Sequence, residues 1–272
     1  MEKTTSIKIS TIESGLANLK GDLLIAFLKD QIKLGNELKK LDEEINGSLN
    51  SYIESNYFKG EQGELKSIFI NKKGLKNIFL LGLGEENKFD LRILTTLIAD
   101  ATKKLRSNGA KDLSIFLESF NTGKFRQEDI VEKIALSSLM GLYNFTDYKT
   151  KDKDKIKYIN QITLITNNQN DFNKEMEYAS VVADAVNKTR DLINTPPNIA
   201  TPEYIADYAV ALSKGNNIKC KIFDDKDIEK LKMGCFIGVA QGSITKPRFV
   251  ILEYYGLDEK QTEVFVANKD LG

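Results

Sequence analysis

Short apolar runs separated by polar segments mark the first part of the chain. The runs at 22–28, 67–70 and 77–81 have the length and composition typical of buried β-strands. An irregular stretch separates the first two runs, and its glycines at 58–64 predict a hairpin or loop. These runs therefore predict strands rather than long helices.

A helical period follows the third apolar run. Apolar residues recur every three or four positions from Leu91 to Leu105, and Gly109 stands where a glycine would end the helix. The next apolar run, 111–117, predicts a strand. We expect it to pair in parallel beside 77–81 through a right-handed crossover.

A helix over 127–143 and a strand over 156–166 complete the first domain, which we place at residues 1–170. The alternating charges of 149–155, between them, predict an exposed loop. Apolar residues then return at near-helical spacing, which predicts a helix over 171–193 that links two domains.

Residues 194–272 form the second predicted domain. Thr201 and Pro202 predict an N-cap followed by proline at the first position of a helix over 202–214. Alternation of helices and strands in both domains indicates the α/β class. The further elements expected here are a short helix at 225–231 and strands at 218–223, 249–254 and 264–267.

Composition narrows the class of protein. Lysine plus arginine equals aspartate plus glutamate, at 39 each, so no net field indicates a nucleic acid or an anionic membrane as partner. The first residues do not resemble a signal peptide, and no apolar run reaches membrane-spanning length. We therefore expect a cytoplasmic protein.

The chain has no histidine and only two cysteines. Catalysis by Ser-His-Asp or Cys-His groups and histidine-ligated zinc are therefore excluded, whereas carboxylates, lysine and bound metal remain possible. Cys220 and Cys235 are too far apart for a Cys-x-x-Cys pair, and we expect both to be small buried side chains.

Three of the four prolines fall within Arg190–Pro202, the most specific segment of the sequence. Read alone, it is a helix-to-helix connection. Together with Leu231–Ser243 and Pro247–Gly256, in the same order and spacing, it resembles the leucyl aminopeptidase family of cytosolic exopeptidases. The resemblance implies an α/β fold, with a macro-like N-terminal domain joined by a helix to an incomplete α/β catalytic domain.

The same resemblance implies a function. Family members are metal-dependent hydrolases that release N-terminal amino acids from peptides with a free N-terminus. They use two divalent ions, manganese or zinc, and assemble as homo-hexamers. None of these properties follows from the composition of the chain.

Lys269 is the only candidate metal ligand that the resemblance places in this chain. The family has a metal-binding lysine shortly after a tyrosine-containing strand, and Val264–Lys269 falls there. Asn268 and Asp270 replace the flanking glycines, and the lysine is displaced by one position. A surface lysine is the alternative, since a lysine amine binds metal only when the cation lowers its pKa.

The sequence ends before the family's Phe-Asp-Ser-Gly-Gly and Asn-Thr-Asp-Ala-Glu-Gly-Arg motifs, which supply the other ligands. A two-metal site needs several carboxylates. We therefore expect a truncated chain that binds no ions and is inactive alone, and we assign no catalytic and no cofactor-binding residue.

Two further groups of residues have simpler explanations. Gly82 and Gly84 could cradle a phosphate, but Asn87 replaces a third glycine, so a tight turn explains them better. The other group consists of four carboxylates without convergent spacing, which fit a solvated loop: Glu253, Asp258, Glu259 and Glu263.

Two alternative functions remain open at this point. One is a binding module for a nucleotide or ADP-ribose-type ligand, lined by Gly82 and Gly84. The other is a non-catalytic oligomer scaffold.

Overall fold

The computed structural model describes residues 7–13, 16, 19–72, 74–167, 170–215, 217–256 and 263–266. The chain divides into two compact units, residues 1–188 and 189–272. No helix in the described ranges is long and apolar enough to cross a lipid bilayer.

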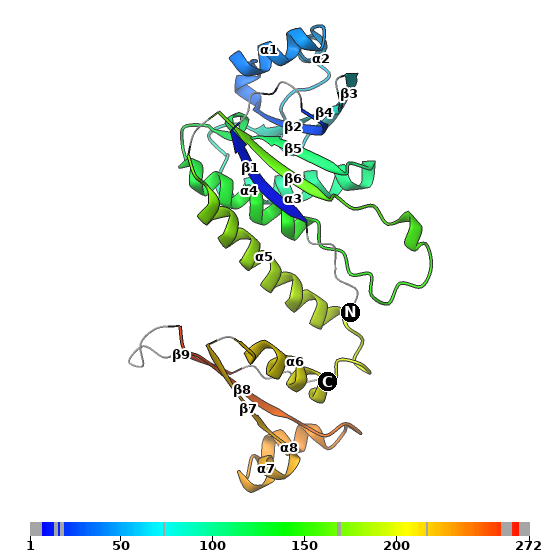
Figure 1. The fold of residues 1–272 in the computed structure, drawn as a ribbon, viewed down its shortest axis with the longest axis vertical. Helices are drawn as coiled ribbons and strands as arrows, with labels where there is room; N and C mark the ends of the chain where they lie inside the picture. The colour runs from blue at the N-terminus through cyan, green and yellow to red at the C-terminus, as the bar shows by residue number, and fades with distance from the viewer. Residues whose placement is uncertain are drawn as a thin grey trace. The chain divides into compact units, whose positions relative to one another are not determined.

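The first unit is built on a six-stranded sheet in the order β1-β6-β5-β2-β4-β3 (Figure 1). Neighbouring strands are parallel except β3, which runs antiparallel to β4 at one edge. The strands are β1 (Lys8–Glu13), β2 (Gly21–Leu28), β3 (Leu65–Lys72), β4 (Leu75–Gly84), β5 (Asp112–Phe116) and β6 (Gln161–Thr166).

Helices cover both faces of this sheet, which gives three layers (Figure 1). One face carries α1 (Asn36–Glu44) and α2 (Ser48–Glu54). The other carries α3 (Leu91–Asn108), α4 (Gln127–Gly141) and the start of α5 (Asn173–Asn194). Short 3-10 turns are η1 (Lys29–Gln31), η2 (Leu117–Phe120) and η3 (Lys153–Lys155).

Strand β2 lies at the centre of the sheet and is buried along its whole length. Leu23, Ile25 and Phe27 face the layer of α1 and α2, whereas Leu24 and Ala26 face α3 and α4. Successive side chains of a strand point to opposite faces, so a continuous apolar run is required where both faces are covered. This confirms the strand predicted at 22–28.

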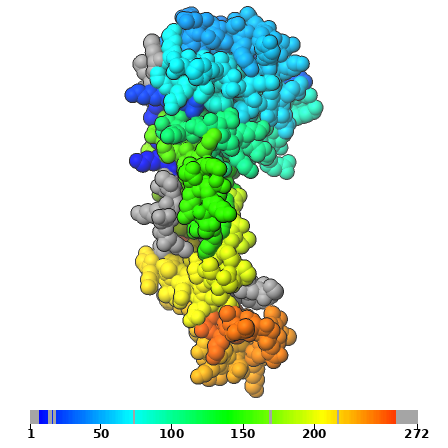
Figure 2. All heavy atoms as spheres, turned by 90° about the vertical axis from the view of Figure 1, so that its right-hand side faces the viewer, coloured from blue at the N-terminus to red at the C-terminus, as the bar shows by residue number. Residues whose placement is uncertain are grey.

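The space-filling view shows how the parts of the first unit on the two sides of β2 are separated along the chain. Apart from β1, which pairs with β6, the blue and cyan part of the chain gathers at one end of the unit, and the green part lies below it (Figure 2). This agrees with the sheet order, in which β2, β4 and β3 are neighbours and β5 and β6 lie on the other side of β2.

Most predicted elements of the first unit are present. The helix over 91–108 begins at Asp90, whose carboxylate accepts from the backbone amide of Ile93 at 2.7 Å. It ends at Gly109, which has a φ of 96° as predicted for a C-terminal glycine. The strand expected over 156–166 begins only at Gln161.

Two helices were not predicted from the sequence. Helices α1 and α2 occupy part of the stretch that showed no regular period, and they are only 9 and 7 residues long. Asp42 of α1 joins them, because its buried Oδ1 accepts from the amides of Leu49 at 2.7 Å and Asn50 at 3.3 Å. A side chain from one helix thus caps the start of the next.

The prediction that the strand at 111–117 pairs beside 77–81 was wrong. This strand, β5, is parallel to β4 in direction but pairs with β2 and β6. Leu24 of β2 lies opposite Ile115 of β5 on one side and Phe79 of β4 on the other. Strand β2 is apolar on both faces. It therefore lies at the centre of the sheet, where helices cover both of its faces.

The second unit combines helices with a three-stranded antiparallel sheet in the order β7-β8-β9. Helix α6 packs on β7 and β8, and α7 packs on β7 and α8. Rings of Phe223, Phe236 and Phe249 join α8 to the sheet, with centroid distances of 5.5 and 6.1 Å. The elements are α6 (Pro202–Ser213), β7 (Ile218–Phe223), α7 (Asp225–Lys230), α8 (Gly234–Ala240), β8 (Phe249–Tyr254) and β9 (Glu263–Val266).

Candidate functional site

The proline corner has a defined backbone path. The amides of Ile199 and Ala200 both donate to the carbonyl of Pro196 at 2.9 Å, which closes a tight turn. The hydroxyl of Thr201 then accepts from the amide of Tyr204 at 3.3 Å, and Pro202 occupies the first turn of α6. The predicted cap is confirmed, and the corner fixes the direction in which α6 begins.

The segment that follows α7 forms helix α8 and then enters β8. Lys246, in the connection to β8, pairs with Asp225 at the start of α7 at 2.6 Å. Their hydrogen bond and opposite charge lower the pKa of the Asp225 carboxyl and raise the pKa of the Lys246 amine. This ion pair holds the connection in place. Among the described residues, no further side chains join Asp225 to form a metal site.

Glu253 is not arranged as a metal ligand. Its Oε2 accepts from the hydroxyl of Tyr255 at 3.1 Å, and Lys219 lies directly opposite it on β7. The Lys219 ammonium also lies 4.5 Å from the centroid of the Tyr255 ring. This cross-strand group of charge and aromatic ring stabilises the hairpin of β7 and β8.

Lys269, Asp258 and Glu259 lie outside the described residues. Glu263 is the first residue of β9, which pairs with β8. Within the described ranges, no three histidine, cysteine, aspartate or glutamate side chains lie together so that they could hold a metal ion. The described residues therefore do not fit a two-metal centre.

Gly82 and Gly84 have a structural role in the first unit. Both belong to β4, and the loop at 60–64 lies directly against them. The amide of Gly63 donates to the Gly82 carbonyl at 2.9 Å, and the amide of Gly82 donates to the Glu64 carbonyl at 2.8 Å. A phosphate cradle at these glycines is therefore not supported, because backbone of the same chain already occupies their amides.

The cysteines differ from expectation. Cys235 is exposed and Cys220 is half-buried, so neither is the fully buried side chain that the sequence suggested. Partial burial raises the pKa of the Cys220 thiol. A raised pKa disfavours the thiolate that a nucleophile or metal ligand requires.

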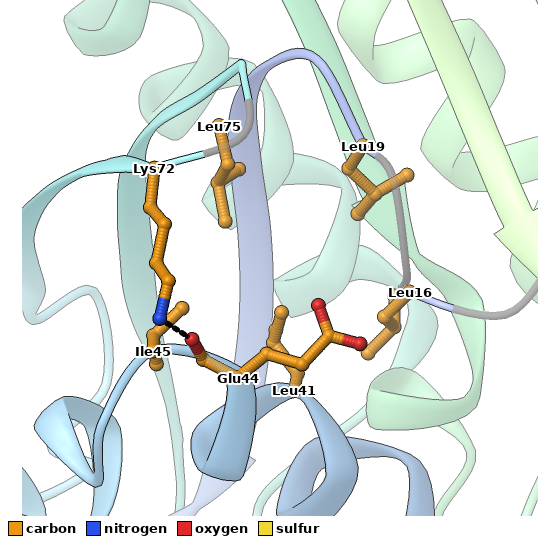
Figure 3. A pocket seen from close by; sticks show the side chains of 7 residues that line it. All are labelled: Leu16, Leu19, Leu41, Glu44, Ile45, Lys72 and Leu75. Atoms are coloured by element: carbon orange, nitrogen blue, oxygen red, sulfur yellow. Dashed lines mark hydrogen bonds between the residues drawn. The ribbon is translucent and has the colours of Figure 1, made fainter.

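A cavity of about 20 Å³ lies between α1 and the sheet of the first unit (Figure 3). Its walls are apolar side chains such as Leu41 and Leu75, and it has room for about one water molecule. Lys72 closes one side by donating to the carbonyl of Glu44 at the end of α1. It is a packing defect beside a helix terminus and too small for a substrate.

Two family models match this chain. The N-terminal domain of the cytosol aminopeptidase family matches residues 25–152, and the catalytic domain of the same family matches residues 187–269. The second match includes the proline corner and all elements of the second unit.

Curated relatives give the same result over nearly the whole chain. A probable cytosol aminopeptidase of Sulfurihydrogenibium is 31% identical over 270 residues, which cover 97% of this chain and 53% of the relative. A probable cytosol aminopeptidase of Alkaliphilus metalliredigens is 29% identical over 259 residues, covering 93% and 52%. The chain thus spans about half the length of the curated relatives it matches.

Solved structures share the fold. A lysine-to-glutamate mutant of tomato leucine aminopeptidase matches with a TM-score of 0.80 at 22% identity, covering 93% of this chain and 52% of that chain. The bottromycin maturation enzyme BotP, in complex with Mn, matches with a TM-score of 0.69 at 16% identity, covering 87% and 46%. With both family models matched in order along the sequence, the chain belongs to the cytosol aminopeptidase family.

Proposed function

We propose that this chain forms the front part of a metal-dependent aminopeptidase that releases N-terminal amino acids from peptides. The match of residues 187–269 to the family's catalytic domain is the observation that carries the proposal. In such an enzyme two divalent ions, manganese or zinc, would supply Lewis-acid chemistry for peptide hydrolysis. The complex of BotP with Mn supports a divalent ion.

The domain division we propose follows the sequence. Residues 1–170 form the N-terminal domain, 171–193 the linking helix and 194–272 the first part of the catalytic domain. The continuous helix α5, Asn173–Asn194, supports this division because it passes from one compact unit into the other.

The role proposed for the second unit is structural support of the catalytic centre. Strand β9 ends three residues before Lys269. We propose Lys269 as the one metal ligand within these 272 residues, and carboxylates of the family's later motifs as the remaining ligands of the whole enzyme. A cytoplasmic location is proposed for the whole protein, in line with the names of its cytosol aminopeptidase relatives. A homo-hexamer is proposed on the resemblance to the family alone.

The 272-residue polypeptide, tested by itself, is proposed to be inactive. The test is hydrolysis of leucine p-nitroanilide by purified protein with added manganese or zinc. Turnover that copurifies with the protein would overturn this part of the proposal.

A fusion tests the aminopeptidase assignment itself. Residues 1–272 are joined to the remaining part of the Sulfurihydrogenibium relative, which is 31% identical over the shared region. We expect manganese-dependent turnover that is lost in Lys269→Ala and retained in Lys226→Ala, which changes an exposed lysine of α7 and serves as the matched control. A folded fusion without any turnover would contradict the aminopeptidase assignment, and full activity of Lys269→Ala would contradict the role of Lys269 as a metal ligand.

A further inference from the structure

A separate candidate site lies in the first unit, far along the sequence from the proposed metal ligand Lys269. A cleft of about 490 Å³ opens at the carboxyl ends of β2 and β5. Leu28, Gly35, Phe116, Glu118 and Asn167 are among the residues that line it. The volume lies within the range of small-molecule binding sites.

The cleft lies where the chain changes direction across the sheet. After β2 the chain passes through α1 and α2 to β3 and β4 on one side of β2. After β5 it passes through η2 and α4 to β6 on the other side. In open α/β sheets, the diverging connections at such a point leave a crevice in which ligands bind.

Glu118 gives the cleft its most distinctive chemistry. One carboxylate oxygen, Oε1, accepts from the hydroxyl of Thr166 at 2.8 Å and from the amide of Asn167 at 2.5 Å. The other, Oε2, is buried and has no hydrogen-bond partner among the described residues. Because a buried carboxylate oxygen without a donor is destabilising, a rotation of the carboxylate that brings this oxygen to a donor on a bound molecule is favoured.

The rest of the lining favours a neutral ligand over a phosphate. Lys33 is the one cation among the described residues that line the cleft. Glu37 lies in the first turn of α1, where its negative charge opposes an anion at the helix N-terminus. The side chains of Asn36, Asn121 and Thr122 are uncharged and can both donate and accept hydrogen bonds.

We propose that this cleft binds a neutral molecule that carries a vicinal diol, a free sugar or a nucleoside, with a hydroxyl donating to Glu118. Acidic side chains at this position of α/β sheets commonly accept from ribose hydroxyls. The proposal is independent of peptidase activity, and its failure would leave that assignment untouched.

Calorimetric titration of the full 272-residue chain tests the proposal with three probes: adenosine, D-ribose and 2′,3′-dideoxyadenosine. We expect saturable binding of adenosine or ribose, which distinguishes a nucleoside from a sugar as the source of the diol. Dideoxyadenosine is expected to bind at least about 10-fold more weakly than adenosine, since it cannot donate to the carboxylate. No saturation by adenosine and ribose up to about 5 mM, or equal binding of the dideoxy compound, would overturn the proposal.

Variants locate the binding within the cleft. Glu118→Gln keeps the oxygen that Thr166 and Asn167 need but replaces the free acceptor with a donor, so binding should weaken about 10-fold or more. Gly35→Trp should block the cleft, because Gly35 has a φ of −70° and open space where a side chain would begin. Glu177→Gln, an exposed carboxylate of α5, is the matched control and should bind as the unchanged protein does.

Binding that survives both Glu118→Gln and Gly35→Trp would refute the assignment to this cleft. If Glu118→Gln fails to fold, the comparison of adenosine with dideoxyadenosine on the unchanged protein still decides the matter. Amide shifts in NMR spectra of the unchanged protein give a separate readout. They should concentrate at 26–28, 116–122 and 167.

Discussion

Gly82→Ala is expected to destabilise the first unit strongly. A Cβ atom at position 82 would lie 2.0 Å from the carbonyl oxygen of Glu61 and 2.6 Å from the carbonyl carbon of Gly60. Both atoms belong to backbone, so the loop at 60–64 must move away from β4. The glycine is therefore required by a close approach of two backbone segments.

The size of the effect follows from the contacts that such a shift breaks. Two backbone hydrogen bonds join Gly82 to the loop, at 2.8 and 2.9 Å. Each contributes about 1 kcal/mol, and displacing the loop adds strain, so the total loss should be about 3 kcal/mol. For a domain of this size that corresponds to a fall in Tm of about 6 to 12 °C.

Chemical denaturation followed by far-UV circular dichroism measures this loss, and Gly109→Ala supplies the comparison. Gly109 has a φ of 96° but open space around its Cβ position. Its replacement by alanine should therefore cost only the conformational penalty, about 1 kcal/mol. If Gly82→Ala destabilised the protein no more than Gly109→Ala, the close approach of the loop would be wrong.

Three further predictions concern caps and charge. Asp42→Ala should lower the free energy of unfolding by about 2 kcal/mol in urea titrations, because two amides at the start of α2 lose a buried acceptor, whereas Asp42→Asn should lose less. Thr201→Ala should destabilise the second unit by about 1 kcal/mol in thermal unfolding, and a loss as large in Thr201→Ser would count against the cap. By NMR titration the carboxyl pKa of Asp225 should lie below 3.8 and rise in Lys246→Gln, so the ion pair stabilises above about pH 3.8 and is lost as the pH falls through the lowered pKa.

The apolar pattern predicted most of the first unit, since burial on two faces requires the continuous runs found at 22–28 and 77–81. Helix α3 was equally predictable, because its apolar residues recur at helical spacing and Gly109 marks its end, whereas the cap by Asp90 was found only in the structure. Helices α1 and α2 were missed because each has few buried residues, such as Leu38, Leu41 and Leu49, among mostly charged residues in α1 and mostly polar residues in α2.

Pairing between strands could not be predicted from neighbours in the sequence. The strand at 111–117 follows 77–81 along the chain, yet β2 lies between them in the sheet. Which strand lies at the centre of a sheet depends on all its strands together, so the sequence pattern of a single segment does not predict it.

The candidate sites differ in the same way. The proline corner is a local motif, so its turn and the Thr201 cap were predictable from sequence. The cleft beside Glu118 was not, because it joins residues from 26–38, 116–122 and 167 that only the folded sheet brings together. A lone glutamate followed by Ser119 carries no signal of its own in the sequence.

The central place of β2 also affects synthesis of the protein. Its partner β5 ends at Phe116, roughly 90 residues after Leu28, and therefore leaves the ribosome later than β2. At about 5 to 20 residues per second, the nascent segment waits roughly 4 to 18 s for that partner. During this interval the apolar run at 23–28 lacks one of its two neighbouring strands, so the emerging polypeptide should bind chaperones that recognise extended hydrophobic segments.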